Sequence, residues 1–243
     1  LARSGRYLPM MRKTLREEGV PQDLVYLAMI ESGFSTKAYS RARASGPWQF
    51  MYATGKMYGL HADWWQDTRR DPELSSRAAA KHLKDLHDAF GDWYLAAAAY
   101  NAGGGKVRRA IARYKTRDFW ELCEAGRYLK PETKNYVPKF LAAALIAKHP
   151  DRFGFHNIEY QAPLAYDVVT VPDATGLDVI SRLTGTELAE IERLNASLRR
   201  SCTPPGRSWQ IKIPRGQKES FETKFAAMPP QKRLTFRKHV IRQ

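Results

Sequence analysis

A short and almost wholly apolar segment near the start of the chain constrains the fold more than any other feature. Residues 23–31 read DLVYLAMIE, and Pro21 stands just before them, where a first helical position is expected. A helix that is apolar on nearly every side belongs inside a core and not on a surface. Ser32 and Gly33 come next, and a glycine at this place predicts a left-handed helix end. The sequence therefore predicts a buried helix that carries Glu31 to the boundary between core and loop.

Further helical patterns follow, and each has a start or a stop signal. Pro72 begins one helix with an apolar stripe, and Gly91 ends it. Asp92 is a good N-cap for the alanine-rich helix that comes next, which the glycines at 103–105 end as a flexible turn. We therefore expect a mainly α domain over residues 1–156.

A last helix of this domain is expected over residues 132–148. It contains Pro138, which either kinks the helix or marks its true start. Residues 35–45 are polar, basic and without a helical period, so they predict a loop. The longest apolar run, residues 140–147, is far too short to span a bilayer.

The sequence changes character after an expected linker at residues 157–164. Residues 166–171 (YDVVTV) and 209–213 (WQIKI) predict strands, and two short helical patterns lie between them. This β-α-α-β order predicts a small separate module at residues 165–215. Residues 216–243 are expected to form a basic, solvated tail, because cations crowd its end without an acid. Those cations are Lys232, Arg233, Arg237, Lys238 and Arg242.

The charge of the chain predicts an anionic partner. Its net charge is +15, from 40 basic and 25 acidic residues, and such a surface attracts nucleic acid, anionic lipid or an acidic cell-wall polymer. The sequence has no zinc-finger spacing, no RNP-like aromatic motif and no convincing helix-turn-helix pattern. We therefore expect no nucleic-acid partner.

Cysteine and histidine spacing argues against a metal centre. Cys123 and Cys202 are too few for a disulfide-dense scaffold or a cysteine-rich metal site. They either bridge the two modules or remain two buried thiols. His82 and His87 are five positions apart, about 140° around a helix, and cannot share a metal. We expect no metal and no cofactor.

Glu31 is the candidate catalytic residue. At the end of an apolar helix, both desolvation and the negative helix terminus disfavour ionisation of its carboxyl. A carboxyl that stays protonated near neutral pH is what a general acid needs. Position alone favours a plainer interpretation, a solvated glutamate at a helix end.

Three further motifs follow Glu31 and change this balance. Together the four are Glu31-Ser32-Gly33-Phe34, Gly46-Pro47-Trp48-Gln49, Ala99-Tyr100-Asn101-Ala102-Gly103 and Tyr136. In this order they resemble the lytic transglycosylases of glycoside hydrolase family 23. Residues 63–83 and 132–139 are similar to the D branch of the membrane-bound murein transglycosylases in particular. The resemblance covers roughly residues 7–155.

The resemblance implies a lysozyme-like helical fold and cleavage of the β-1,4 bond between N-acetylmuramic acid and N-acetylglucosamine. In that family one glutamate first protonates the glycosidic oxygen and then accepts the proton of the C6 hydroxyl, which leaves a 1,6-anhydromuramyl end. Two-carboxylate glycosidases need a second acid nearby. Asp63 and Asp67 are candidates, but we interpret them as structural residues of a polar loop.

The same resemblance implies a set of substrate-binding residues around Glu31. These are Ser40, Gln49, Phe50, Met51, Tyr100, Asn101 and Tyr136. Ser40 and Gln49 are expected near the cleaved bond, with Phe50 and Met51 as wall residues. Tyr100 and Asn101 are expected to line the muramyl subsite, and Tyr136 to hydrogen-bond or position Glu31.

The C-terminal module resembles a degenerate LysM domain, a peptidoglycan-binding fold. Matching positions include 166–170 (YDVVT), 183–186 (LTGT), Leu194-Asn195 and 211–214 (IKIP). Residues 172–177 (PDATGL) depart from the family's Pro-Gly-Asp-Thr-Leu turn. The resemblance therefore implies the LysM fold more strongly than it implies sugar binding.

Three functions from two classes remain open. The first is a monomeric lytic murein transglycosylase that acts on peptidoglycan glycan strands, located in the periplasm or cell envelope. An outer-membrane association would come from a segment not in this chain. The second is a goose-type lysozyme-like hydrolase of the same bond. The third, from another class, is a non-catalytic cell-wall-binding protein.

Overall fold

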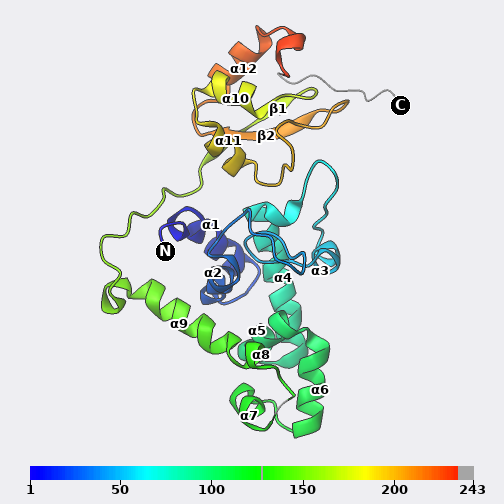
Figure 1. Ribbon diagram of the computed structural model, residues 1–243, viewed down its shortest axis with the longest axis vertical. Coiled ribbons are helices and arrows are strands. Elements are labelled where there is room, and N and C mark those ends of the chain that lie inside the picture. The colour runs from blue at the N-terminus through cyan, green and yellow to red at the C-terminus, as the bar shows by residue number, and fades with distance from the viewer. Residues whose placement is uncertain (127, 235–243) are drawn as a thin grey trace. The chain divides into compact units, whose positions relative to one another are not determined.

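The protein is described by a computed structural model, which covers residues 1–126 and 128–234 (Figure 1). Its chain forms two compact units. The first consists of Leu1–Leu60 and Pro72–Pro163, and the second of His61–Asp71 and Leu164–Gln243. The chain therefore contributes to the second unit twice, once through a short segment that interrupts the first unit.

The first unit is mainly helical, and residues 33–51 form a long loop between its second and third α-helices (Figure 1). Its α-helices are α1 (Ser4–Glu17), α2 (Tyr26–Ser32), α3 (Tyr52–Met57), α4 (Pro72–Phe90), α5 (Trp93–Ala102), α6 (Gly104–Tyr114), α7 (Phe119–Glu124), α8 (Pro131–Lys134) and α9 (Tyr136–Lys148). Its 3-10 helices are η1 (Gln22–Val25) and η3 (Pro150–Phe153). No described helix is long and apolar enough to cross a membrane.

The helix α2 lies inside the core, as its sequence predicts. Tyr26, Leu27 and Ala28 are each at most 1% exposed, and the helix packs against α9. It ends at Gly33, whose φ of 58° is left-handed. The prediction of a buried helix with a glycine end is therefore confirmed from Tyr26 onward, whereas residues 23–25 belong to the 3-10 helix η1. The helix brings Glu31 to the edge of the core.

The helix α5 occupies a central place in the first unit. Leu95 is fully buried, as are the four alanines that follow it, and the helix contacts α4, α6, α8 and α9. Alanine side chains allow these neighbours to pack closely, which fixes the end of α5 that carries Tyr100. As predicted, the carboxylate of Asp92 caps the helix and accepts a 2.8 Å hydrogen bond from the Leu95 amide.

Two predictions about the helix ends of this unit are wrong. The glycine run at 103–105 is not a flexible turn, because Gly104 and Gly105 already belong to α6 and only Gly103, with φ 86°, makes the turn. The expected helix at 132–148 is two helices that break at Asn135 and not at Pro138. A proline in the first turn of α9 leaves no helical hydrogen bond unmade, which explains why it causes no kink.

The second unit contains the predicted β-α-α-β order. Its elements are β1 (Tyr166–Val171), α10 (Leu177–Thr184), α11 (Leu188–Leu194), β2 (Trp209–Pro214), α12 (Lys218–Ala226) and the 3-10 helices η2 (Thr68–Arg70) and η4 (Pro230–Lys232). The two strands are antiparallel, with Val169 opposite Ile211. Val169, Ile180 and Ile211 are at most 2% exposed, so the helices cover a small core of their own.

The expectation of a solvated tail after residue 215 is wrong for α12. Phe221 and Phe225, one turn apart, stack with their ring centroids 5.4 Å apart. Both are buried in the core of the second unit. The density of basic residues concealed this apolar pair. The tail cations Arg237, Lys238 and Arg242 lie outside the described residues.

The segment His61–Asp71 is held within the second unit by backbone and ionic contacts. The Asp67 amide donates to the Ser197 carbonyl at 2.7 Å, and the Arg199 amide donates to the Trp65 carbonyl at 2.8 Å. Asp71 forms an ion pair of 3.2 Å with Lys212 on β2. Local sequence patterns do not predict these contacts, because they join positions more than a hundred residues apart.

The two cysteines are free thiols. Cys123 lies in the first unit and is half-buried, and Cys202 lies in the second and is buried. Burial raises the pKa of each thiol above its ordinary value.

Candidate active site

Glu31 lies in the last turn of α2 and is half-buried. The hydroxyl of Tyr136, the first residue of α9, donates a hydrogen bond to Glu31 Oε1 at 2.7 Å. Tyr136 is itself 5% exposed, so core packing fixes its hydroxyl. The packing of α2 against α9 therefore holds the carboxyl in one position.

The surroundings of Glu31 favour its protonated form. Burial raises the pKa of the carboxyl above its ordinary value, and the negative charge of Glu132 acts in the same direction. The hydrogen bond from Tyr136 opposes the shift, because it stabilises the carboxylate, yet the pKa remains raised. Such a carboxyl can donate a proton near neutral pH.

The loop after residue 45 is clamped next to α2 by three hydrogen bonds. Ser32 Oγ donates to the Pro47 carbonyl at 2.8 Å, and Tyr100 Oη donates to the Trp48 carbonyl at 2.7 Å. The indole nitrogen of Trp48 donates to Ser76 Oγ on α4 at 2.8 Å, and Trp48 is fully buried. Residues from the first three motifs and α4 thus share one hydrogen-bonded network.

Gln49 adopts a backbone conformation that is unusual for its residue type. Its φ is 49°, in the left-handed region, and its side-chain amide donates to the Gly46 carbonyl at 2.9 Å. A non-glycine residue in this region is mildly strained and persists only where the surroundings hold it. The buried Trp48 and the hydrogen bond to the Gly46 carbonyl stabilise this conformation. They fix the position of the Gln49 side chain, which lines a pocket.

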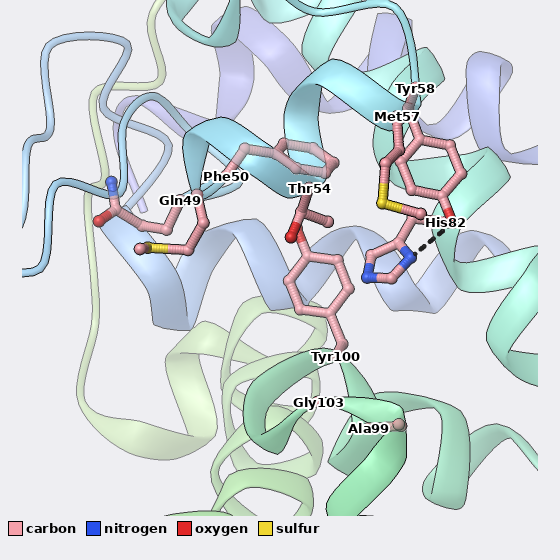
Figure 2. A pocket seen from close by; sticks show the side chains of 11 residues that line it. Gln49, Phe50, Thr54, Met57, Tyr58, His82, Ala99, Tyr100 and Gly103 are labelled. Atoms are coloured by element: carbon pink, nitrogen blue, oxygen red, sulfur yellow. Dashed lines mark hydrogen bonds between the residues drawn. The ribbon is translucent and has the colours of Figure 1, made fainter.

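A pocket of about 260 Å³ opens beside this loop (Figure 2). Four of the expected substrate-binding residues line it, namely Gln49, Phe50, Met51 and Tyr100. Burial raises the pKa of Tyr100 well above its ordinary value, and the nearby charge of Glu31 adds to the effect. This electrostatic contact relates the pocket to the candidate acid.

Two expected binding residues form hydrogen bonds outside the pocket. Ser40 Oγ accepts a 3.0 Å hydrogen bond from the Ala44 amide within its own loop. Asn101 Oδ1 accepts from Thr133 on α8 at 2.9 Å, and its amide group donates to Glu132 at 3.4 Å. Neither side chain lines the pocket. Asn101 therefore ties α5 to α8, next to the start of α9.

The pocket also contains polar residues that the sequence motifs do not predict. His82 on α4 and Tyr58 after α3 both line it. A usable signal was present, because His82 follows the buried Ala78 by one helical turn and so lies on the same face of α4.

Asp63 and Asp67 have structural roles in the second unit. Asp67 is 5% exposed and forms a 2.7 Å ion pair with Arg69. Asp63 Oδ1 accepts hydrogen bonds from the amides of Trp65 and Gln66. Their carboxylates are engaged in shaping the 61–71 segment.

Comparison with known proteins assigns both parts of the chain. The transglycosylase SLT domain family matches residues 9–123, a range that contains Glu31, Gln49 and Tyr100. Residues 165–229 match the LysM-like domain of the lytic transglycosylase MltD. The SLT match thus falls on the first unit and on the 61–71 segment of the second, and the LysM-like match falls on the second unit.

Several proteins with sequences similar to this chain are named as murein or peptidoglycan transglycosylases. Membrane-bound lytic murein transglycosylase D of Escherichia coli strain K12 is 31% identical over 230 residues, which are 93% of this chain and 50% of the relative. Peptidoglycan transglycosylase gp16 of Escherichia phage T7 is 38% identical over 142 residues, 57% of this chain and 10% of the relative. The chain thus spans about half the length of the Escherichia coli relative.

Solved structures support the fold of the SLT domain. The 70 kDa soluble lytic transglycosylase of Escherichia coli has a TM-score of 0.50 and 25% identity, covering 63% of this chain and 25% of that one. A complex of the 70 kDa soluble lytic transglycosylase with bulgecin A has a TM-score of 0.52 and 26% sequence identity. The match covers 60% of this chain and 24% of that one. These likenesses confirm the expected lysozyme-like helical domain. The small β-α-α-β module after it is confirmed by its own elements and by the match of residues 165–229.

Proposed function

We propose that this chain is a peptidoglycan lytic transglycosylase in which Glu31 is the single catalytic carboxylate. The observation that carries the proposal is the placement of Glu31. It is half-buried, hydrogen-bonded by Tyr136 at 2.7 Å, raised in pKa and electrostatically coupled to Tyr100 in the adjacent pocket. A protonated, positioned carboxyl next to a pocket with aromatic walls fits acid catalysis on a sugar.

The proposed reaction uses Glu31 twice. Its proton passes to the glycosidic oxygen as the bond from that oxygen to the anomeric carbon breaks, which leaves a carboxylate. The C6 hydroxyl oxygen of the same muramyl residue then bonds to the anomeric carbon, and the Glu31 carboxylate takes the hydroxyl proton. Glu31 is returned to its starting state, and no water is consumed.

The Tyr136 hydroxyl suits both halves of this cycle. It donates to Glu31 Oε1 and so stabilises the carboxylate that forms after the first proton transfer. Burial raises the pKa of Tyr136 well above its ordinary value, so the hydroxyl keeps its proton. Gln49, Phe50, Met51 and Tyr100 form the sugar-binding wall in this proposal.

Ser40 and Asn101 have different places in the proposal. Asn101 acts through the α8 contact that adjoins Glu132, and not as a pocket residue. Ser40 reaches substrate only if the substrate displaces its bond to the Ala44 amide. Single substitutions of Asn101 and Ser40 test these two roles, and the quantity to measure is the KM for glycan fragments.

Digestion of purified peptidoglycan tests the proposal, with the fragments weighed by mass spectrometry. Wild-type protein is expected to release muropeptides with 1,6-anhydromuramyl ends. Glu31→Gln should lower turnover by at least a hundredfold, since general acid–base catalysis contributes about that much or more. The matched control is Glu222→Gln, the same change at an exposed site on α12, which should leave turnover unchanged.

The same experiment separates the two alternatives. Fragments with reducing muramyl ends, each one water heavier, would favour a goose-type lysozyme-like hydrolase. Binding to sacculi without fragment release would favour a non-catalytic wall-binding protein. Full turnover by Glu31→Gln would contradict the role of Glu31 under either catalytic function.

We also propose that the LysM-like module binds peptidoglycan and that the protein acts in the periplasm or cell envelope. The support is the match of residues 165–229 to the LysM-like domain of a lytic transglycosylase and the membrane-bound relatives. In place of the family's turn, Asp173 accepts hydrogen bonds from the Ala174 and Gly206 amides. Co-sedimentation of Glu31→Gln protein with sacculi, with and without substitutions in this turn, measures the contribution of the module.

A further inference from the structure

A chain of hydrogen bonds runs from the pocket to the surface of α4, and neither the catalytic proposal nor the motifs account for it. Tyr58 Oη donates to Asp85 Oδ2 at 2.9 Å. His82 Nδ1 lies 2.9 Å from the same Tyr58 oxygen. His82 and Tyr58 line the pocket. Asp85 is exposed and forms the outer end of this series of hydrogen bonds.

The direction of these bonds fixes the tautomer of His82. Tyr58 has one hydroxyl proton, and an ionised Asp85 carboxylate can only accept, so that proton is directed to Asp85. The Tyr58 oxygen can then only accept from His82, which requires a hydrogen on Nδ1. The other nitrogen, Nε2, is left without a hydrogen in the neutral ring and is an acceptor.

The neutral ring is the stable form at physiological pH. Burial lowers the pKa of His82 to about 4, and the negative charge of Asp85 opposes this only in part. The pKa of Tyr58 is raised well above its ordinary range by burial and by the bond to Asp85, so its hydroxyl stays protonated. His82 and Tyr58 are therefore both neutral near pH 7.

The ring of His82 is fixed and open on one side. Its centroid lies 4.9 Å from that of Tyr58, 5.3 Å from that of Tyr100 and 6.3 Å from that of Phe50. Figure 2 shows the bond to Tyr58 at one nitrogen and the second nitrogen on the opposite edge of the ring, toward Tyr100. Among the described residues, Nε2 has no hydrogen-bond partner, and it is not enclosed.

We infer that His82 is a substrate-recognition residue, whose Nε2 accepts a hydrogen bond from a hydroxyl or amide N–H of the sugar bound in this pocket. Tyr58 and Asp85 are positioning residues that hold the tautomer. The inference rests on the proposed function and names the chemistry that the pocket selects. A neutral acceptor favours an uncharged sugar that carries donors and disfavours a carboxylate, which brings only further acceptors.

Two substitutions at position 82 separate the two nitrogens. Asn places a polar atom near the former Nδ1 and can keep the bond to Tyr58, but it leaves nothing at Nε2. Gln reaches the former Nε2 position and keeps an acceptor there. We expect His82→Asn to raise KM for N-acetylglucosamine-containing glycan fragments roughly tenfold with a much smaller change in kcat, and His82→Gln to raise KM less.

The control is His156→Gln, at an exposed histidine that does not line the pocket, which should leave KM unchanged. Equal effects of His82→Asn and His82→Gln would overturn the inference, because a structural histidine does not distinguish its nitrogens in this way. A loss confined to kcat would also overturn it, since recognition of the bound sugar must appear in KM.

A spectroscopic test works without turnover. A long-range proton–nitrogen correlation spectrum of full-length Glu31→Gln protein should show His82 neutral with its hydrogen on Nδ1 at pH 7, and Tyr58→Phe should lose that preference. Addition of N-acetylglucosamine tetramer should shift the Nε2 signal. A hydrogen on Nε2, or an Nε2 signal unmoved by saturating tetramer, would contradict the inference.

The two tests also separate this inference from the proposed function. If wild-type protein cleaves no peptidoglycan but the tetramer shifts Nε2, the catalytic proposal fails and sugar recognition stands. Suppose instead that anhydro fragments form, that the tetramer does not shift the Nε2 signal, and that His82→Asn and His82→Gln have equal KM values. Only the role of His82 is then contradicted.

Discussion

At the scale of the residue, the site depends on opposing influences on one carboxyl. Burial and the charge of Glu132 raise the pKa of Glu31, and the Tyr136 hydrogen bond lowers it. The net effect is a raised pKa, which favours the protonated form of Glu31. Because the hydrogen bond and the charge come from different side chains, Tyr136 and Glu132, each can be removed separately.

Tyr136→Phe and Glu132→Gln should therefore move the pH dependence of activity in opposite directions. The reaction begins with protonated Glu31, so kcat/KM falls as pH rises through its pKa. Loss of the Tyr136 bond raises that pKa further and moves the alkaline limb to higher pH, whereas loss of the Glu132 charge lowers it. Turbidity clearance of sacculi across pH measures both limbs, and a shift in the same direction for both variants would contradict the electrostatic account.

Replacing Glu31 by Gln should stabilise the fold in a pH-dependent way. The folded-state pKa of Glu31 is raised by burial, so the favourable contribution of the protonated group is complete below the unfolded-state pKa. It is lost as pH rises through the folded-state pKa. The Tm difference between Glu31→Gln and wild type is expected to grow from acid to mildly alkaline pH. Calorimetry that gave a constant difference would exclude a raised pKa.

Residue identity was enough to nominate Glu31 and Tyr136 but not His82. The motifs are local, and a resemblance identifies them from their order. The environment of His82 depends on Phe50, Tyr58 and Tyr100, which come from three separate segments. Only the packed structure shows that these rings surround it.

At the scale of the element, helix ends with a clear chemical signal were predictable. Asp92 caps α5, and Gly33 and Gly91 adopt the left-handed conformation that ends α2 and α4. The helices α6 and α12 were missed, because glycine at 104 and a dense basic sequence argue locally against order. Tertiary packing outweighs such local propensity when a helix has apolar residues to bury.

The helix α12 supplies a stability prediction of this kind. Phe221→Ala should destabilise the second unit by about 3–5 kcal/mol, because Phe221 is 1% exposed and stacks on Phe225. The exposed Glu222→Ala on the same helix is the control and should change stability by less than about 0.5 kcal/mol. Hydrogen exchange resolved by segment measures both. Equal protection of β1 and β2 in the two variants would show that α12 is not part of the core.

At the scale of the whole molecule, the second unit is built from two separated stretches of chain. The segment His61–Asp71 makes its backbone and ionic contacts with residues 164–243, through Ser197, Arg199 and Lys212. A chain cut after Pro163 would lack Lys212, which pairs with Asp71, and Arg199, whose amide donates to the Trp65 carbonyl.

Such a truncation should free the 61–71 segment. We expect a protein of residues 1–163 to be cleaved by protease within this segment many times faster than the full chain, because its anchoring contacts are gone. Cleavage sites and rates come from mass spectrometry of a limited digest. A segment equally resistant in both proteins would show that the first unit alone holds it.

The central claim, that Glu31 drives cleavage without water, is tested most directly by digestion in water labelled with heavy oxygen. A lytic transglycosylase forms its new bond from the C6 hydroxyl of the substrate, so the muramyl ends should carry no label, and Glu31→Gln should release almost no fragments. One labelled oxygen at each new muramyl end would show that water attacks the anomeric carbon, and would contradict the account.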